Sequence, residues 1–368
     1  MRSIDAKDLE RFVIREVDPD DLDALYALSA HLDSVNFPHD RALLEALIAR
    51  ARGSFTGQTK DVFERQYMFV MEGLETGRIA GTSMIFAQHG HSETPHVFFD
   101  VVTDERYSAT LDRHFSHTTL RLGFNYRGPT EIGALVLDPA LRAHGLGKQL
   151  SYVRFLFIAM FRERFQRSII AELMPPLLED GRSLLWEHLG KHFTGLTYQD
   201  ADKLSDRNKE FIVALFPHTP LYASLLPEEV RAMIGQVGDE TKGVKRMLEA
   251  IGFEYSERID PFDGGPHFEA ATDDITLVRD SRRAIVSDKT LENAEENSEL
   301  SRRRNGDALP PLHEPVRSLV AVAKEKGPRR FRATVAAIRR DGKSVTLSRH
   351  AMKTLGVKSG AAVWTVPI

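Results

Sequence analysis

The chain has 368 residues, enough for roughly two or three domains of about 150 residues each. Its hydrophobic fraction of 42% and charged fraction of 28% are typical of a globular protein with a sizeable core, and they exclude a chain that is mainly disordered. The net charge of −4 provides no global basic field for nucleic acid or anionic lipid. The absence of cysteine excludes disulfides, thiolate metal ligands and cysteine nucleophiles, and it fits a reducing cytoplasm.

Neither the amino terminus nor the interior carries a membrane signal. The first residues, MRSIDAKDLERF, have no apolar stretch of the kind that a signal peptide requires. The longest apolar-looking run, 153–161, is interrupted by Arg154 and is far shorter than the roughly 20 residues of a membrane span. We therefore expect a cytoplasmic protein that does not associate with a membrane.

The first part of the chain predicts a strand, two helices and a hairpin, at residues 12–15, 20–31, 41–52 and 67–86. We expect Gly53 to end the second helix, since glycine often follows the last helical turn.

The next segment is the most informative. Residues 132–137, IGALVL, form an apolar run of strand length, and the turn RAHGLG follows at 142–147. Apolar residues then recur at three- and four-residue spacing from 146 to 165, which predicts a long amphipathic helix. A strand at 168–173 and a helix at 183–191 come next, so the unit is strand, glycine turn, helix, strand, helix.

The remaining chain predicts three helices, at about 208–215, 228–234 and 242–250, and a strand that begins at 253. We interpret 1–285 as one acyl-CoA N-acyltransferase region, with room for two similar halves. The polar composition of 286–315 favours a linker or mobile loop, and the short apolar runs of 316–368 favour a small β-barrel.

The glycine turn carries a physical signal for an anion. Gly145 and Gly147 allow a close approach to the backbone, and the free amides at a helix start suit a pyrophosphate. Arg142 adds a charge-assisted contact, and Leu146 begins the helix. The third glycine of a Rossmann turn is absent, as is the G-x-x-x-x-G-K-[ST] of a P-loop.

What remains resembles motif A of the GCN5-related N-acetyltransferase fold, in which this loop holds the pyrophosphate of coenzyme A. The alternative is an ordinary strand-to-helix turn.

Further segments resemble the arginine N-succinyltransferase family in their order and spacing: EIGALVLDP at 131–139, RAHGLG at 142–147, LWEHLGK at 185–191, IGQV at 234–237 and DPFDGGP at 260–266. The resemblance implies an α/β chain with a mixed sheet, namely the GCN5-related acyl-CoA N-acyltransferase fold with a small carboxy-terminal β-barrel. It also implies transfer of succinyl from succinyl-CoA to the α-amino group of arginine, the entry step of an arginine-degradation route.

The same resemblance implies roles for particular residues. It places the succinyl-CoA thioester at Leu135, with backbone groups of Val136 and Leu137 beside it. It also implies a proton-donating histidine directly after IGQV, where this chain has Gly238. His218, Asp239 and Glu240 lie nearby in sequence, and the identity of the general acid stays open.

Two glutamates are the candidate catalytic residues. Glu131, at the start of the central strand, is our candidate base, and the alternative is a solvated strand-end carboxylate. Glu172 lies in an otherwise apolar strand, so it is either a partner for the substrate's cationic group or a member of a structural ion pair.

Substrate-binding candidates follow from charge. Arg182 and Lys191 are candidates to face the succinyl carboxylate, although we favour the alternative, a solvated helix face. Asp263 either reaches the substrate or belongs to a structural turn.

We expect no metal. His89, His91, His96, His114 and His117 have partly ligand-like spacing, but no nearby carboxylate pattern closes a site.

We expect small-molecule substrates and no nucleic acid, and the oligomers that we consider are a homodimer and a hetero-oligomer with a paralogue. Among the basic residues between 324 and 340, Phe331 is the only aromatic side chain, so the interleaved aromatics of a nucleic-acid face are nearly absent. The alternative functions are a related acyltransferase with another donor or amine, such as ornithine, and a non-catalytic relative that binds CoA or nucleic acid.

Overall fold

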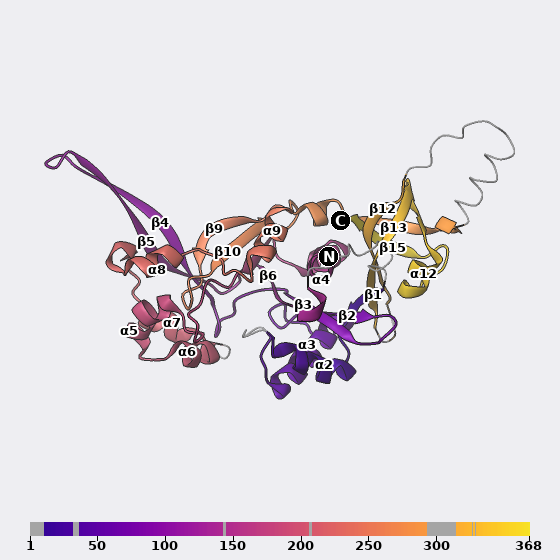
Figure 1. The fold of residues 1–368 in the computed structure, drawn as a ribbon, viewed down its shortest axis with the longest axis horizontal. Coiled ribbons are helices and arrows are strands. Elements are labelled where there is room, and N and C mark those ends of the chain that lie inside the picture. Colours follow the sequence, from indigo (N-terminus) through magenta and orange to yellow (C-terminus); the bar gives the residue numbers. More distant parts are fainter. Residues whose placement is uncertain are drawn as a thin grey trace. The chain divides into compact units, whose positions relative to one another are not determined.

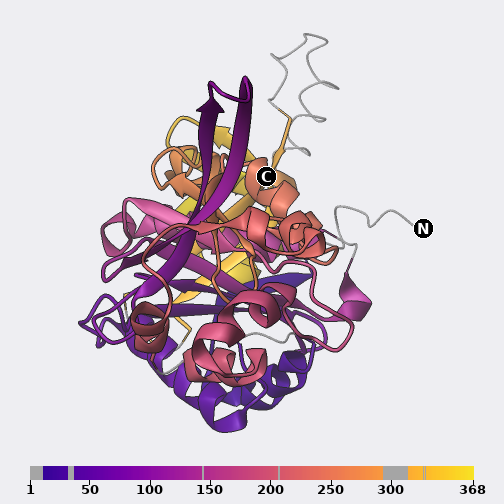
Figure 2. The same cartoon turned by 90° about the vertical axis from the view of Figure 1, so that its left-hand side faces the viewer.

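The computed structural model describes residues 11–31, 37–142, 145–205, 208–292, 314–325, 327 and 329–368. The chain divides into two compact units, each assembled from separate stretches of sequence. Unit 1 comprises Met1–Ile85, Ala134–Phe165 and Thr276–Ile368, and unit 2 comprises Phe86–Gly133 and Gln166–Ile275. Figure 1 and Figure 2 show the elements of each.

Unit 1 is built on a barrel that continues into an open sheet. Its strands are hydrogen-bonded in the order β12 (Val316–Ala323), β15 (Ala362–Pro367), β11 (Arg282–Thr290), β14 (Ser344–Leu347), β13 (Phe331–Asp341), β1 (Phe12–Glu16), β2 (Gln66–Gly73), β3 (Ile79–Phe86) and the later part of β6 (Thr130–Leu137). An additional pairing of β12 with β13 closes the first five into a barrel around a core of small and branched side chains.

The predicted carboxy-terminal β-barrel is confirmed, and it includes β11 from outside the predicted segment. The boundary that we expected at residue 286 falls inside this strand. The later part of the expected linker, 293–313, lies outside the described residues. The division into 1–285, 286–315 and 316–368 otherwise stays a prediction.

The helices of unit 1 are α2 (Leu22–Ser29), α3 (Arg41–Thr56), α4 (Leu146–Met160), α10 (Thr276–Arg279) and α12 (Arg349–Leu355). The expected end of α3 at Gly53 is wrong. The helix continues for one turn because Ser54 and Phe55 are buried, and it ends at Gly57, whose φ of 75° supplies the left-handed cap.

Unit 2 is a sheet with the order β6, β7 (Ser168–Glu172), β10 (Pro266–Ala271), β9 (Glu254–Ile259), β4 (His96–Ser108), β5 (Arg113–Asn125) and β8 (Leu221–Tyr222). The first residues of β6 pair in parallel with β7, with Glu131 opposite Ile170. β10 is antiparallel to β7, and this register sets His267 opposite Glu172.

The longest strands of the protein, β4 and β5, form a hairpin that the sequence analysis did not predict. Its outer half is polar and exposed and gives no alternating apolar pattern, with Leu111 62% exposed. Figure 1 and Figure 2 both show the tip of the hairpin projecting as a narrow arm.

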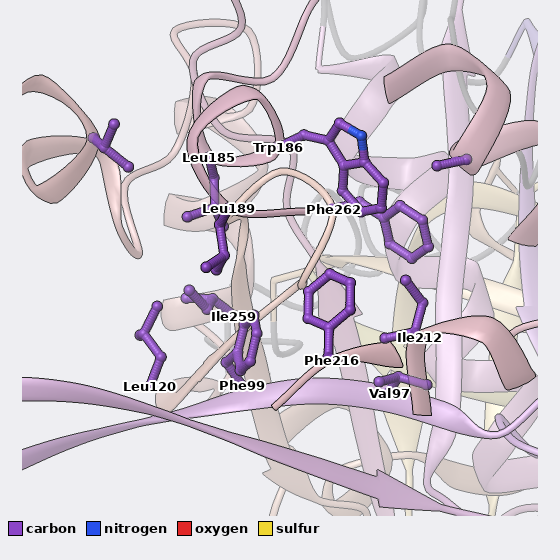
Figure 3. Packing of buried hydrophobic residues seen from close by; sticks show 12 residues of the cluster. Val97, Phe99, Leu120, Leu185, Trp186, Leu189, Ile212, Phe216, Ile259 and Phe262 are labelled. Atoms are coloured by element: carbon purple, nitrogen blue, oxygen red, sulfur yellow. The ribbon is translucent and has the colours of Figure 1, made fainter. Parts of the chain in front are cut away.

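Short helices pack with this sheet around an aromatic core. They are α5 (Lys191–Thr194), preceded by a π-helical turn (Trp186–Gly190), then α6 (Tyr198–Ser205), α7 (Glu210–Leu215), α8 (Glu228–Met233) and α9 (Lys242–Glu249). Trp186 is fully buried and stacks on Phe262 with ring centroids 5.1 Å apart. Figure 3 shows the two rings side by side in this core. Its indole N–H donates to the Leu196 carbonyl at 3.0 Å.

No helix in the described part of the chain combines the length and the apolar composition that a membrane crossing needs.

We expect the Trp186→Ala variant to lower the stability of unit 2 by about 3–5 kcal/mol, because the change removes a buried ring and leaves a cavity. Urea unfolding of this variant should have a clearly lower midpoint than that of the wild type. Leu225→Ala is the control, since Leu225 is 85% exposed and its loss should cost no more than about 0.5 kcal/mol. Equal midpoints for the two variants would contradict the packing described here.

Candidate functional site

The predicted glycine turn lies in unit 1, at the start of α4. Gly145 has a φ of 71° and is the N-cap residue, so no side chain at this position satisfies the first helical amides. Leu146 is buried and anchors the first turn, whereas Arg142 is exposed. Amides left unpaired at a helix start, together with the positive end of the helix dipole, favour an anion.

The turn is held in place by close packing of β3 on β6 and α4. A Cβ at Gly81 would lie 2.5 Å from the carbonyl oxygen of Val136, so only glycine permits this approach. The Ser83 hydroxyl donates to the carbonyl of Leu150 at 2.8 Å, which ties α4 to β3. At Gly147, by contrast, an added Cβ would meet no atom of the described residues within 4 Å, so the packing of those residues does not require glycine there.

The strand that leads into the turn contains a strained residue. Ala134 has a φ of 47°, which an L-residue rarely adopts inside a strand, and it directly precedes the candidate CoA-binding residues Leu135, Val136 and Leu137. Val136 is buried, while Leu135 and Leu137 are partly exposed. Such a distortion interrupts the ladder and redirects backbone groups, a feature that is common beside functional sites.

In unit 2, Glu131 is buried and pairs with a histidine. The distance between its Oε2 atom and His89 Nδ1 is 2.5 Å. The Glu131 side chain is 4% exposed and that of His89 is 16% exposed, so the imidazole is the more accessible partner. Burial would lower the pKa of His89, but the charge and hydrogen bond of Glu131, together with Glu172, raise it above the ordinary value.

Glu172 lies between two buried histidines. The Nε2 atoms of His96 and His267 are 3.4 Å and 3.5 Å from Glu172 Oε1, longer than ordinary hydrogen bonds. Both rings are about 1% exposed, and neither ring nitrogen of either histidine has a hydrogen-bond partner among the described residues. Burial lowers the pKa of each to about 4, so both are neutral at pH 7.

Glu172 itself remains ionised. Burial favours its protonated form, but His267, His96 and His89 hold its pKa well below the usual range.

Two aspartates add further negative charge. Burial, and then the charge of Glu172, raise the pKa of Asp260 to about 7, while burial and Asp260 raise the pKa of Asp263 well above its ordinary value. Each carboxylate accepts one backbone hydrogen bond, Asp260 from Phe262 at 2.6 Å and Asp263 from Gly265 at 2.7 Å. Both remain partly accessible.

We call the following seven residues of unit 2 the acid–histidine cluster: His89, His96, Glu131, Glu172, Asp260, Asp263 and His267. It contains three of the candidates from sequence, Glu131, Glu172 and Asp263. Within it, two groups of three residues have ligand atoms within 4.8 Å of one another: His89, His96 and Glu172, and Glu172, Asp260 and His267. This spacing suits a cation, and the expectation that no metal binds stays a prediction.

The two cationic residues predicted to face the succinyl carboxylate lie outside the acid–histidine cluster. Arg182 and Lys191 are exposed and both pair with Glu187, at 3.6 Å and 2.9 Å. Arg182 also pairs with Asp180 at 2.7 Å. These contacts are those of a solvated face, and the structure does not bring either residue into the cluster.

The position of the implied histidine has no room for a side chain. A Cβ at Gly238 would lie 2.9 Å from the carbonyl oxygen of Pro175, and the Gly238 amide donates to Met174 at 2.9 Å. The neighbouring alternatives in sequence, His218, Asp239 and Glu240, are all exposed.

Sequence reasoning missed His267 and Asp260, and it considered His89 and His96 only as metal ligands. A signal for His267 was present, because it is a polar residue in the apolar strand PHFEAA, as Glu172 is in SIIAE. The partners themselves depend on the strand order of unit 2, which no local pattern specifies.

Comparison with known proteins gives the family. A family model described as the arginine N-succinyltransferase beta subunit matches residues 12–277, and one described as its C-terminal domain matches residues 308–367. The chain belongs to the arginine N-succinyltransferase family. The expected α/β fold, with its mixed sheet and carboxy-terminal barrel, is confirmed.

Similar proteins cover most of the chain. An arginine N-succinyltransferase of Yersinia pestis (strain Pestoides F) is 39% identical over 284 residues, which are 76% of this chain and 81% of that protein. One from Salmonella paratyphi B is 36% identical over 279 residues, 75% and 80% of the two chains. The structure of an arginine/ornithine succinyltransferase subunit AI from Pseudomonas aeruginosa superposes with a TM-score of 0.78 at 28% identity, covering 97% of this chain and 98% of that one.

We expect the Asp260→Asn variant to be more stable than the wild type at pH 8, with a difference that shrinks toward pH 4. The raised pKa of Asp260 means that the native state favours the protonated acid. The stability that the protonated acid contributes to the wild type is therefore lost as pH rises from about 4 to about 7. Thermal unfolding across this range measures the effect, and asparagine can still accept the hydrogen bond from Phe262.

The control is Asp239→Asn, since Asp239 is exposed and the hydrogen bond from Lys242 lowers its pKa. It should show no gain at pH 8. If the wild type is instead more stable than Asp260→Asn at pH 8, the ionised form of Asp260 does not destabilise the native state, and the prediction is wrong.

Proposed function

We propose that this protein transfers the succinyl group of succinyl-CoA to the α-amino group of L-arginine. The observation that supports arginine as the acceptor is the acid–histidine cluster: it gathers carboxylates, which accept hydrogen bonds, around neutral imidazoles, each of which has one acceptor nitrogen. Arginine brings an ammonium and a guanidinium, which are donors with no acceptor atoms. Family membership supports the same acceptor and the succinyl donor.

Cation binding would also relieve an unfavourable charge. Asp260 and Asp263 are desolvated near Glu172, which is why their pKa values are raised. An arginine guanidinium bound at the cluster would favour both carboxylates in their ionised form and pair with them bidentately. We therefore assign Asp263, with Asp260 and Glu172, to the acceptor's cationic groups.

For the donor we propose the glycine turn and β6. The amides of Gly145, Leu146 and Gly147, with Arg142, would hold the pyrophosphate, and the backbone of Leu135 to Leu137 would hold the pantetheine and polarise the thioester carbonyl. Glu131 is four residues from Leu135 on the same strand.

The chemistry is a direct transfer. The acceptor ammonium loses a proton, the amine attacks the thioester carbonyl, an amide N–H stabilises the oxyanion, and the carbon–sulfur bond breaks. Because a thioester is already activated, no covalent intermediate on the protein is needed.

The direct test is turnover, followed by thiol release from succinyl-CoA or acetyl-CoA with arginine or ornithine as acceptor. We expect the largest kcat/KM with succinyl-CoA and arginine. A higher kcat/KM with acetyl-CoA would overturn the assignment of succinyl-CoA as the donor, and a higher kcat/KM with ornithine would overturn the assignment of arginine as the acceptor. No turnover in any pairing, with no CoA binding by calorimetry, would overturn the enzymatic function.

We expect the Gly147→Ala variant to raise the dissociation constant for succinyl-CoA about 10-fold, an effect of about 1.4 kcal/mol. The added methyl group meets no atom of the described residues within 4 Å, so a loss of CoA affinity would report a ligand that occupies this space. Calorimetric titration with CoA measures the change.

Gly243→Ala, inside α9, is the matched control, because a Cβ there also meets nothing within 4 Å. Both variants should keep or slightly raise the melting temperature, since alanine favours a helix over glycine. Unchanged CoA affinity in Gly147→Ala would count against the pyrophosphate site.

A further inference from the structure

The cluster contains a histidine–carboxylate pair whose geometry differs from that of its other members. Glu131 is the more deeply buried partner, and its oxygen is engaged by His89 Nδ1 at 2.5 Å. A carboxylate that accepts from Nδ1–H fixes the imidazole tautomer and leaves Nε2 with a lone pair. This is the arrangement by which a buried acid orients a histidine base.

The other members of the cluster are less suited to accept a proton. His96 and His267 are about 1% exposed, and burial makes both weak bases. Glu172 is held ionised by its histidine neighbours, so it too is a weak base.

The position after IGQV also supplies no acid–base group in this chain. Gly238 has no side chain and no space for one, and the nearby His218 is exposed and directed to the Val213 carbonyl at 3.0 Å. A proton acceptor must therefore come from another element, and His89 is the accessible imidazole of the cluster.

We propose that His89 is the catalytic base that takes the proton of the acceptor ammonium, and that Glu131 is a positioning residue acting through it. This inference rests on the proposed function and revises our expectation that Glu131 itself is the base. It also gives a role to a histidine that no comparison assigns.

The proton balance is complete. His89 Nε2 takes one proton from the α-ammonium, and the neutral amine forms a bond to the thioester carbon. As the carbon–sulfur bond breaks, the second proton passes from the amine nitrogen of the tetrahedral intermediate to the sulfur. The imidazolium then releases its proton to water, so that the reaction yields the amide, CoA thiol and one proton.

The surroundings of His89 set its pH dependence. Glu131 of β6 and Glu172 of β7 favour its charged form, whereas Lys209, just before α7, disfavours it. The His96 ring, from β4, packs edge-on with centroids 4.5 Å apart. Because Glu131 contributes the largest effect that raises the pKa of His89, its removal should lower that pKa.

The test is the pH profile of kcat/KM, using whichever acceptor the wild-type enzyme turns over. His89→Asn should lower kcat/KM by about 100-fold or more, with CoA affinity unchanged. It should also remove the acid limb of the profile, which is the fall in kcat/KM at low pH. Glu131→Gln should keep an acid limb but move it to lower pH, with a smaller loss of rate. Exogenous imidazole should restore part of the activity of His89→Ala.

His114→Asn is the matched control, since His114 is exposed on the β4–β5 hairpin and its ring packs at a tilt against Tyr107. Loss of the acid limb in Glu131→Gln alone would make Glu131 the base and overturn the proposal. A kcat/KM for His89→Asn within three-fold of that of the control would also overturn the proposal. So would wild-type activity that a chelator abolishes and a divalent ion restores. The wild-type rate is measured first. A wild-type protein without turnover would contradict the proposed function, whereas an active wild type with an active His89→Asn variant would contradict only the assignment of His89 as the base.

Discussion

The constraint on which unit 2 depends is the desolvation of several carboxylates in one place. Glu172 remains ionised because histidines lie beside it, whereas Asp260 and Asp263, which are desolvated near Glu172, hold their protons more tightly. An isolated buried charge is costly, so a cluster of this kind is stable only when protons or cations balance it. A cationic amino acid that brings its own charge is the ligand that such a cluster favours.

The two candidate sites use different parts of the chain. The turn at Gly145 offers backbone amides, and its geometry follows from a positive φ, a helix start and the tight contact at Gly81. The cluster offers side chains, and its geometry follows from the register of β10 on β7 and the parallel pairing of β6 with β7. Backbone recognition suits a donor whose diphosphate is always the same, whereas side-chain recognition suits an acceptor that must be selected.

This difference explains how much the sequence predicts. The strand, glycine turn and helix around Gly145 are local, and the sequence predicted all three. The end of α3 was wrong because burial of Phe55 outweighs the helix-breaking tendency of Gly53. The roles of His96 and His267 did not emerge, because Glu172 meets them only through the order β7, β10, β9, β4, which joins segments about a hundred residues apart.

Gly238 shows why a family pattern cannot be transferred without the structure. Its amide and its missing Cβ both face Met174 and Pro175, so this position contributes backbone packing to the segment that follows Glu172. A histidine at this point would need the backbone to move. An imidazole with a buried carboxylate behind it lies instead at His89, on a different segment but in the same unit. Acid–base chemistry depends on where a proton acceptor lies and what orients it, and only secondarily on which segment supplies it.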